Sequence, residues 1–94
     1  MESRALKQLR SMRCRIIYRG EFSIQDSDAY KQLLSEFFRW ISDIQDPIHK
    51  DIVMLYYFRG WSYVRIGDHL HYSDAQIKRM KYDIENNNKK NPGG

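Results

Sequence analysis

The stretch Gly60–Met80, GWSYVRIGDHLHYSDAQIKRM, contains two short helix signals that are separated by three residues. Ser62 and Ser73 are each followed by an apolar-periodic segment, and serine is a favoured N-cap because its hydroxyl accepts from free backbone N–H groups. Gln76 lies three residues after Ser73, which is the spacing of a capping box. Two capped helices joined by so short a turn are typical of a helix-turn-helix.

The first helix of this pair should span residues 63–70, the turn residues 71–73, and the second helix residues 74–86. A hydrophobic residue precedes each cap (Trp61 and Tyr72), and an isoleucine follows at the fourth position of each helix. This pairing is a hydrophobic staple, which fixes the angle at which the chain enters a helix. Two staples in succession predict a rigid corner of the size that the DNA major groove accepts.

The free face of the second helix carries the residues expected to meet DNA. Ile77, Met80 and Ile84 recur at helical spacing and should point inward. Arg79 is the first choice for a base contact, because a guanidinium donates two hydrogen bonds to guanine O6 and N7. The predicted DNA-binding residues are Ser73, Asp74, Ala75, Gln76, Lys78, Arg79, Lys81 and Tyr82. An ordinary solvated helix face is the alternative interpretation of these cations.

Two helices are predicted in the N-terminal half. Residues 4–18 carry leucines and isoleucines near helical spacing with arginines between them, and residues 29–44 carry a wide apolar face around Phe37. Trp40 is expected on the far side of the second of these helices from Phe37. More apolar surface than one neighbour can cover indicates a homodimer.

A further helix is predicted over residues 47–58, directly before the corner. Asp46 is a favourable N-cap, and Pro47 suits the first helical position, where its missing N–H costs nothing. Gly60 should end this helix. The expected inward stripe is Ile48, Ile52, Leu55 and Phe58.

The charge is distributed unevenly along the chain. Residues 1–20 hold six basic side chains against one acidic side chain, residues 21–61 hold four against seven, and residues 74–94 hold five against three. Two basic ends around an acidic middle favour a polyanion as the partner, whereas mere solubility is the simpler reading. The possible phosphate contacts outside the second helix of the corner are Arg65, Arg13 and Arg15.

Length and composition limit the possible classes. Ninety-four residues with 41% hydrophobic content suit one small domain, and no apolar run approaches the ~20 residues that span a bilayer. One cysteine fits a reducing compartment. His69 and His71 lack the further ligands that a metal site needs. No catalytic motif is legible, so we expect no enzyme, no cofactor and no metal.

From Asp46 to Asn87 the chain resembles the promoter −35-binding region of bacterial sigma factors. The matching residues are the apolar helix that ends in YYFRG, then W-S-Y-x-x-I-G-x-x-L, then Y-S-x-x-x-I-K-R. With the Phe/Trp-rich helix in front, it is similar to the ArpU/RinA-type late transcription regulators of phages and prophages. His71 stands where a glycine is common in this turn, so a left-handed backbone is expected there.

The resemblance implies a function and a set of contacts. Positions 74, 75 and 79 would face bases, and positions 76 and 78 would approach the DNA backbone. RNA polymerase would be a partner, and the protein would act in the cytoplasm of a bacterial host cell.

These observations together predict an all-α small helical domain with a sigma-like helix-turn-helix in its C-terminal half. Residues 1–45 form a basic helix and an apolar helix, residues 46–86 the DNA-binding domain, and residues 87–94 a disordered tail. The expected function is sequence-specific transcription regulation on double-stranded DNA, as a phage or mobile-element homodimer. The alternatives are a protein-binding module that grips RNA polymerase or another regulator, and a small-terminase-like DNA-packaging protein, which would form rings.

Overall fold

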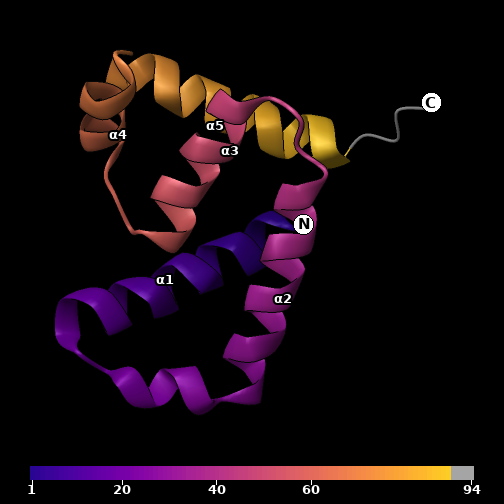
Figure 1. Ribbon diagram of the computed structural model, residues 1–94, viewed down its shortest axis with the longest axis vertical. Coiled ribbons are helices and arrows are strands. Elements are labelled where there is room, and N and C mark those ends of the chain that lie inside the picture. The colour runs from indigo at the N-terminus through magenta and orange to yellow at the C-terminus, as the bar shows by residue number, and fades with distance from the viewer. Residues whose placement is uncertain (90–94) are drawn as a thin grey trace.

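The computed structural model describes the backbone of residues 1–89 and the side chains of residues 1–86. Every regular element in that part is a helix, which confirms the predicted all-α class (Figure 1). The elements are α1 (Ser3–Arg19), the 3-10 turn η1 (Phe22–Asp26), α2 (Asp28–Ser42), α3 (Pro47–Val53), the π-helical segment η2 (Met54–Phe58), α4 (Tyr63–Leu70) and α5 (Asp74–Lys89). In Figure 1, α3, α4 and α5 form the upper part of the molecule, while α1, η1 and most of α2 form the lower part.

The last helix runs further than predicted. α4 has the predicted bounds, but α5 continues to Lys89, so the disordered tail predicted for residues 87–94 begins inside a helix. The remaining part of that predicted tail, residues 90–94, lies outside the described residues.

α1 packs one side on the core and stops at a glycine. It buries Leu6, Leu9 and Ile16, which follow helical spacing. Gly20 ends the helix with φ 69°, a left-handed conformation that glycine adopts without steric cost. Its N–H donates to the Ile16 carbonyl at 3.1 Å, which satisfies one of the carbonyls that the end of the helix leaves free.

Ser27 is the N-cap of α2, and its hydroxyl accepts from the Tyr30 N–H at 3.1 Å. The prediction that Trp40 lies away from Phe37 is wrong. Trp40 is 8% exposed, and its ring packs against the Phe37 ring with centroids 6.2 Å apart. Steps of seven and three residues put Trp40 on the stripe through Tyr30 and Phe37, whereas Phe38 falls beside this stripe and is 43% exposed.

The helix predicted over residues 47–58 starts as predicted, but its last turn is η2 and faces the core differently. The Asp46 carboxylate accepts from the Ile48 N–H at 2.9 Å, and Pro47 occupies the first position. Leu55 and Phe58, predicted to point inward, are only partly buried, whereas Tyr57 is 1% exposed.

The cause of this difference is the π-helical turn of η2. The Arg59 N–H donates at 3.0 Å to the Met54 carbonyl, five residues back instead of four. The wider turn shifts the following side chains around the helix axis, so Tyr57 points into the core. Gly60 follows with φ 71° and ends the segment, as predicted.

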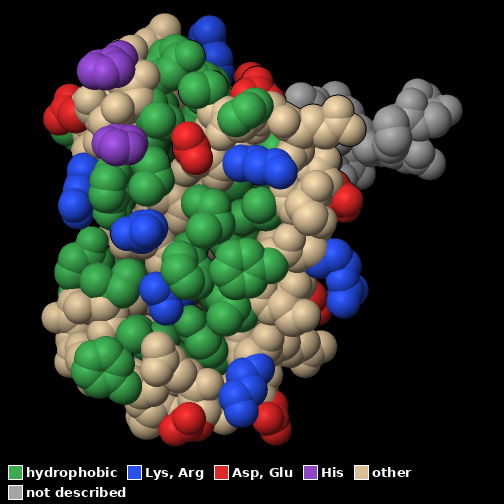
Figure 2. All heavy atoms as spheres, viewed as in Figure 1, with side chains coloured by type: hydrophobic (Ala, Val, Ile, Leu, Met, Phe, Trp, Pro, Cys, Tyr) green, Lys and Arg blue, Asp and Glu red, His purple; other side chains and the backbone are tan. Residues whose placement is uncertain are grey.

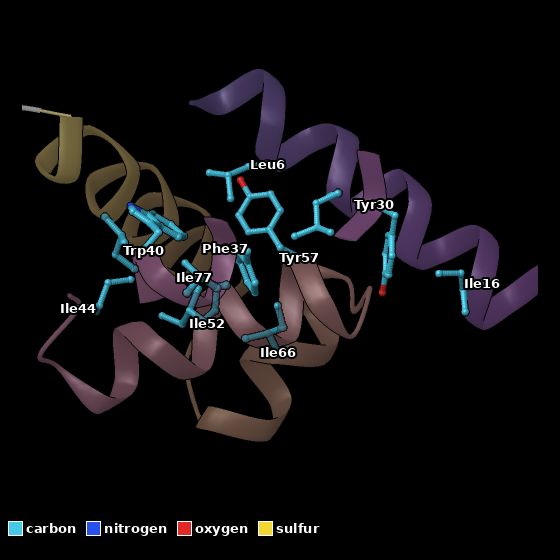
Figure 3. Close-up of a cluster of buried hydrophobic side chains, with 13 residues drawn as sticks. Leu6, Ile16, Tyr30, Phe37, Trp40, Ile44, Ile52, Tyr57, Ile66 and Ile77 are labelled. Atoms are coloured by element: carbon cyan, nitrogen blue, oxygen red, sulfur yellow. The ribbon is translucent and has the colours of Figure 1, made fainter. Parts of the chain in front are cut away.

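One hydrophobic cluster connects all the helices (Figure 3). Tyr57 lies between Leu6 and Phe37 in Figure 3, so α1, α2 and η2 meet at this point. Ile66 of α4 and Ile77 of α5 are completely buried in the same cluster. The predicted segments 1–45 and 46–86 therefore share a core, and the helix-turn-helix is anchored on both.

Candidate nucleic-acid interface

Both helices of the corner are capped by the predicted serines. The Ser62 hydroxyl accepts from the Arg65 N–H at 3.2 Å at the start of α4. The Ser73 hydroxyl accepts from the Gln76 N–H at 3.1 Å, and the Gln76 side-chain oxygen accepts from the Ser73 N–H at 2.9 Å. The second pair of bonds is the predicted capping box, and each cap stabilises its helix by about 1 kcal/mol.

Two backbone features shape the turn between α4 and α5. His71 has φ 66°, the left-handed conformation expected for it. Gly67 lies directly under the turn, where its carbonyl accepts from the Tyr72 N–H at 2.9 Å. A Cβ atom at Gly67 would overlap with the Tyr72 carbonyl oxygen, so a side chain there would push the turn away. The close neighbour of Gly67 is therefore the backbone of the turn.

The outward face of α5 presents Ala75, Lys78, Arg79 and Tyr82, all of which are exposed. Together with Tyr63 and Lys81 they line a shallow depression of about 400 Å³. Asp74 is exposed at the tip of the helix, and Tyr82 is 66% exposed. We call this surface the α5 face. In Figure 2, lysine and arginine side chains are interspersed with hydrophobic side chains across the middle of the molecule.

Lys78 and Arg79 are the uncommitted cations of the α5 face. Within the described residues neither side chain makes a hydrogen bond or an ion pair. Both charges are therefore available to an anionic ligand.

Lys81 is committed inside the protein, in contrast to its predicted role at DNA. Its ammonium group donates to the Glu85 carboxylate at 2.8 Å and to the Tyr57 hydroxyl at 3.1 Å, and its side chain is 14% exposed. The Tyr57 hydroxyl donates to the other Glu85 oxygen at 2.5 Å. Burial and the bond to Glu85 raise the pKa of Tyr57 well above its usual range. This network fastens α5 to η2, and the DNA contact of Lys81 stays a prediction.

Arg13 is likewise taken up by the protein itself. Its guanidinium donates to the Phe58 carbonyl at 2.8 Å and to the Tyr30 hydroxyl at 3.0 Å, and it lies 3.8 Å from the centre of the Phe58 ring. These bonds use Nε and Nη1 and leave Nη2 without a partner among the described residues. Arg13 therefore has a structural role, and its phosphate contact stays a prediction.

Arg10 has the same structural role one turn earlier in α1. It donates to the carbonyls of Tyr56 at 3.0 Å and Trp61 at 3.2 Å, with its guanidinium 4.1 Å from the centre of the Tyr56 ring. Tyr56 in turn stacks on Tyr63 of α4, with centroids 4.7 Å apart. Cations suit the carbonyl end of a helix, and Arg10 and Arg13 both bind that end of the α3–η2 segment.

Arg15 and Arg65, the other predicted phosphate contacts, remain near the surface. Arg15 pairs with the Glu21 carboxylate at 2.8 Å. This hydrogen bond lowers the pKa of Glu21, and the carboxylate offsets the charge of Arg15. Arg65 is exposed, and its guanidinium lies 4.0 Å from the centre of the Trp61 ring.

Sequence reasoning missed three participants. Arg59 and Tyr63 border the two depressions beside α4, and Glu85 binds Lys81. The spacing of four residues between Lys81 and Glu85 was a visible signal for an ion pair. The position of Arg59 depends on the π-helical turn, which no local sequence pattern predicted.

Neither a metal site nor a membrane span is found in the described part of the chain. No three His, Cys, Asp or Glu side chains among these residues come together as metal ligands. His69 instead packs edge-on against the Trp61 ring, with centroids 5.4 Å apart. Among the same residues, no helix has both the length and the apolar character needed to cross a bilayer.

No protein-family model, curated protein or solved structure matches this chain.

Proposed function

We propose that the protein is a sequence-specific DNA-binding transcription regulator that reads the major groove with α5. The observation that carries this proposal is the α5 face: two uncommitted cations, Lys78 and Arg79, on the second helix of a rigidly capped corner. A helix in that position of a helix-turn-helix presents its exposed face to base edges.

The α5 face suggests a role for each side chain. Arg79 donates to guanine O6 and N7, and Lys78 contacts a phosphate as a point charge. Ala75 and the Tyr82 ring supply the apolar surface that a thymine methyl group or a deoxyribose can contact. Ser73 and Gln76 hold the tip of the helix through the capping box, and Asp74 stands beside them.

The sigma-factor resemblance extends this proposal to partners. It supports contact with RNA polymerase, a phage or mobile-element origin and action in the bacterial cytoplasm. A homodimer is also part of the proposal. Dimeric helix-turn-helix proteins bind two half-sites about 34 Å apart. Trp40 lies in the core, so Phe38 is the large exposed apolar side chain of α2 that supports a contact between two protomers.

The experiment is fluorescence anisotropy on labelled promoter DNA at several salt concentrations, with the wild type, Arg79→Ala and Lys78→Ala. Wild-type affinity should fall as salt rises, because binding releases counterions from the DNA. Arg79→Ala should cost about 1–3 kcal/mol and relax the sequence preference. Lys78→Ala should weaken all sequences alike and lower the salt slope by about 1.

A matched control is Lys31→Ala, which removes an exposed lysine from α2. It should leave both affinity and preference unchanged. Absence of wild-type binding even at low salt would remove the proposal.

One observation favours the protein-binding alternative. Exposed apolar side chains surround the corner, with Tyr82 at 66%, Val64 at 58% and Tyr72 at 37% exposure. Such a patch suits a protein partner such as RNA polymerase. If Val64→Ser abolishes polymerase binding while DNA is not bound at all, this alternative replaces the first. A ring-sized mass in sedimentation would instead favour a packaging protein.

A further inference from the structure

A second basic depression lies beside the N-terminal end of α4. It has a volume of about 430 Å³ and no acidic side chain among its lining residues. We call it the arginine groove. Its walls include Arg13, Arg59 and Arg65 and the rings of Tyr18, Phe58 and Trp61.

Two of the three guanidinium groups are held in place by aromatic rings. Arg13 lies over Phe58 and is fixed by hydrogen bonds, and Arg65 lies over Trp61 with its guanidinium 4.0 Å from the ring centre. Stacking occupies the face of a guanidinium and leaves the N–H groups at its edge able to donate. Arg59 is exposed, and its side chain makes no hydrogen bond or ion pair with the residues that the structure describes.

This arrangement suits one kind of ligand. Guanidinium groups bind phosphate oxygens with two parallel hydrogen bonds, and ordering them beforehand reduces the entropy that binding costs. The adjoining start of α4 adds the partial positive charge of a helix N-terminus. Three arginines without a lining carboxylate therefore favour a phosphate group.

The position of the groove agrees with the path of DNA along the α5 face. Tyr63 borders the α5 face and Arg65 borders the arginine groove. Side chains two residues apart point about 200° apart around a helix, so the two surfaces lie on opposite sides of α4. The major groove of DNA is about 12 Å wide, so a helix bound inside it has a phosphate strand along each side. The first helix of a helix-turn-helix crosses one of these strands.

We propose that the arginine groove binds a backbone phosphate of the DNA that α5 reads, with Arg59 and Arg65 as the donors. This inference rests on the proposed function and adds a second, sequence-independent contact to it. Arg59 lies outside both helices of the corner, so the π-helical turn that positions it becomes part of the DNA-binding surface.

The test measures the salt dependence of DNA affinity for the wild type, Arg59→Gln and Arg65→Gln. Each substitution should reduce the slope of log K against log salt by about 0.9 and weaken all sequences equally. Arg39→Gln is the matched control: it removes an exposed arginine of α2 that borders a different depression, beside Glu36 and Asp43. Its slope should equal that of the wild type, and circular dichroism checks that each variant is folded.

Several results would overturn the inference. If the wild type binds DNA and both groove variants keep its slope, the groove is not a DNA contact, although the proposed function stands. If inorganic phosphate or polyglutamate changes the tryptophan emission of the wild type but not of Arg65→Gln, while the DNA slopes stay equal, the groove serves a free anion or an acidic protein. If the wild type does not bind DNA, the proposed function itself fails, and this assignment fails with it.

Discussion

Lys78 and Lys81 lie three residues apart on α5, yet their ammonium groups have different surroundings. Lys78 is exposed and uncommitted, whereas Lys81 is bonded to Glu85 and Tyr57. A charge that is paired and buried stabilises the fold only as long as its partner stays, because removing one member leaves an uncompensated charge. We therefore expect Lys81 to contribute to the stability of the fold and Lys78 to DNA binding.

Replacing each lysine by methionine should reveal this separation. Lys81→Met leaves the buried Glu85 carboxylate without its cation and should lower the free energy of unfolding by about 2–3 kcal/mol. Lys78→Met should change it by less than about 0.5 kcal/mol and instead weaken DNA binding. Urea denaturation followed by circular dichroism measures the first effect, and anisotropy measures the second. Equal stability of the two variants would contradict the assignment.

His71 is a second residue whose backbone is decisive. Its left-handed conformation costs a non-glycine residue about 1 kcal/mol, which the flanking caps offset. His71→Gly should therefore raise the free energy of unfolding by about 0.5–1 kcal/mol. His69→Gly, two residues earlier inside α4, should lower it by about 1 kcal/mol. Thermal denaturation of both variants tests this prediction, because the two changes in the free energy of unfolding must have opposite signs.

At the scale of elements, α1 acts as a clamp on the segment that precedes the corner. Arg10 and Arg13 bind the carbonyls of Tyr56, Phe58 and Trp61, where the π-helical turn ends. The helix in which the sequence suggested two phosphate contacts, Arg13 and Arg15, thus uses Arg10 and Arg13 to hold η2 in place.

The clamp predicts a difference between two basic residues of α1. Arg10→Ala removes two charge-assisted hydrogen bonds and the contact with the Tyr56 ring, and it should cost about 2 kcal/mol of unfolding free energy. Lys7→Ala removes an exposed side chain from the same helix and should stay within about 0.5 kcal/mol of the wild type. Chemical denaturation provides the values. A cost for Arg10→Ala as small as that for Lys7→Ala would rule out the clamp.

The contact between η2 and the helices of the corner also predicts a pH dependence. Burial raises the pKa of Tyr57 and of Tyr63 above the usual value of about 10. Above that pH the unfolded chain releases these protons while the folded chain keeps them, so stability is complete below about pH 10 and falls as pH rises further.

Urea denaturation between pH 8 and pH 11 tests this expectation. The decline above pH 10 should be shallower in Tyr63→Phe, which has one fewer raised tyrosine. A wild-type stability that stays level up to pH 11 would contradict the account.

The elements were predictable where the signals are local. The caps at Asp46, Ser62 and Ser73 depend on neighbours within a few residues, so the starts of three helices followed from the sequence. The partners of Arg13 and Lys81 were not predictable in this way. Phe58 lies 45 residues from Arg13 and Tyr57 lies 24 residues from Lys81, and no local pattern reports such contacts.

The π-helical turn explains the rest of the difference. A stripe predicted from periodicity assumes 3.6 residues per turn. A single wider turn therefore moves the later side chains of the same helix off that stripe. It turned Tyr57 inward, moved Leu55 and Phe58 toward the surface and placed Arg59 beside α4. The surface that these residues form could be seen only in the structure and was not predicted from the sequence.

At the scale of the whole molecule, one core supports two basic surfaces. The α5 face and the arginine groove lie on either side of the start of α4, and both are tied to α1 through η2. Because α1, η2 and the corner share this core, a duplex on α5 would meet a preformed surface with little to order on binding.

The most direct measurement is a map of backbone amide chemical shifts as duplex DNA is added to the labelled protein at low salt. We expect changes concentrated at residues 73–82 of α5 and residues 59–65 around the start of α4. Changes centred on α2 around Phe38, or no changes at all, would contradict the claim that the corner of Gly60–Met80 reads DNA.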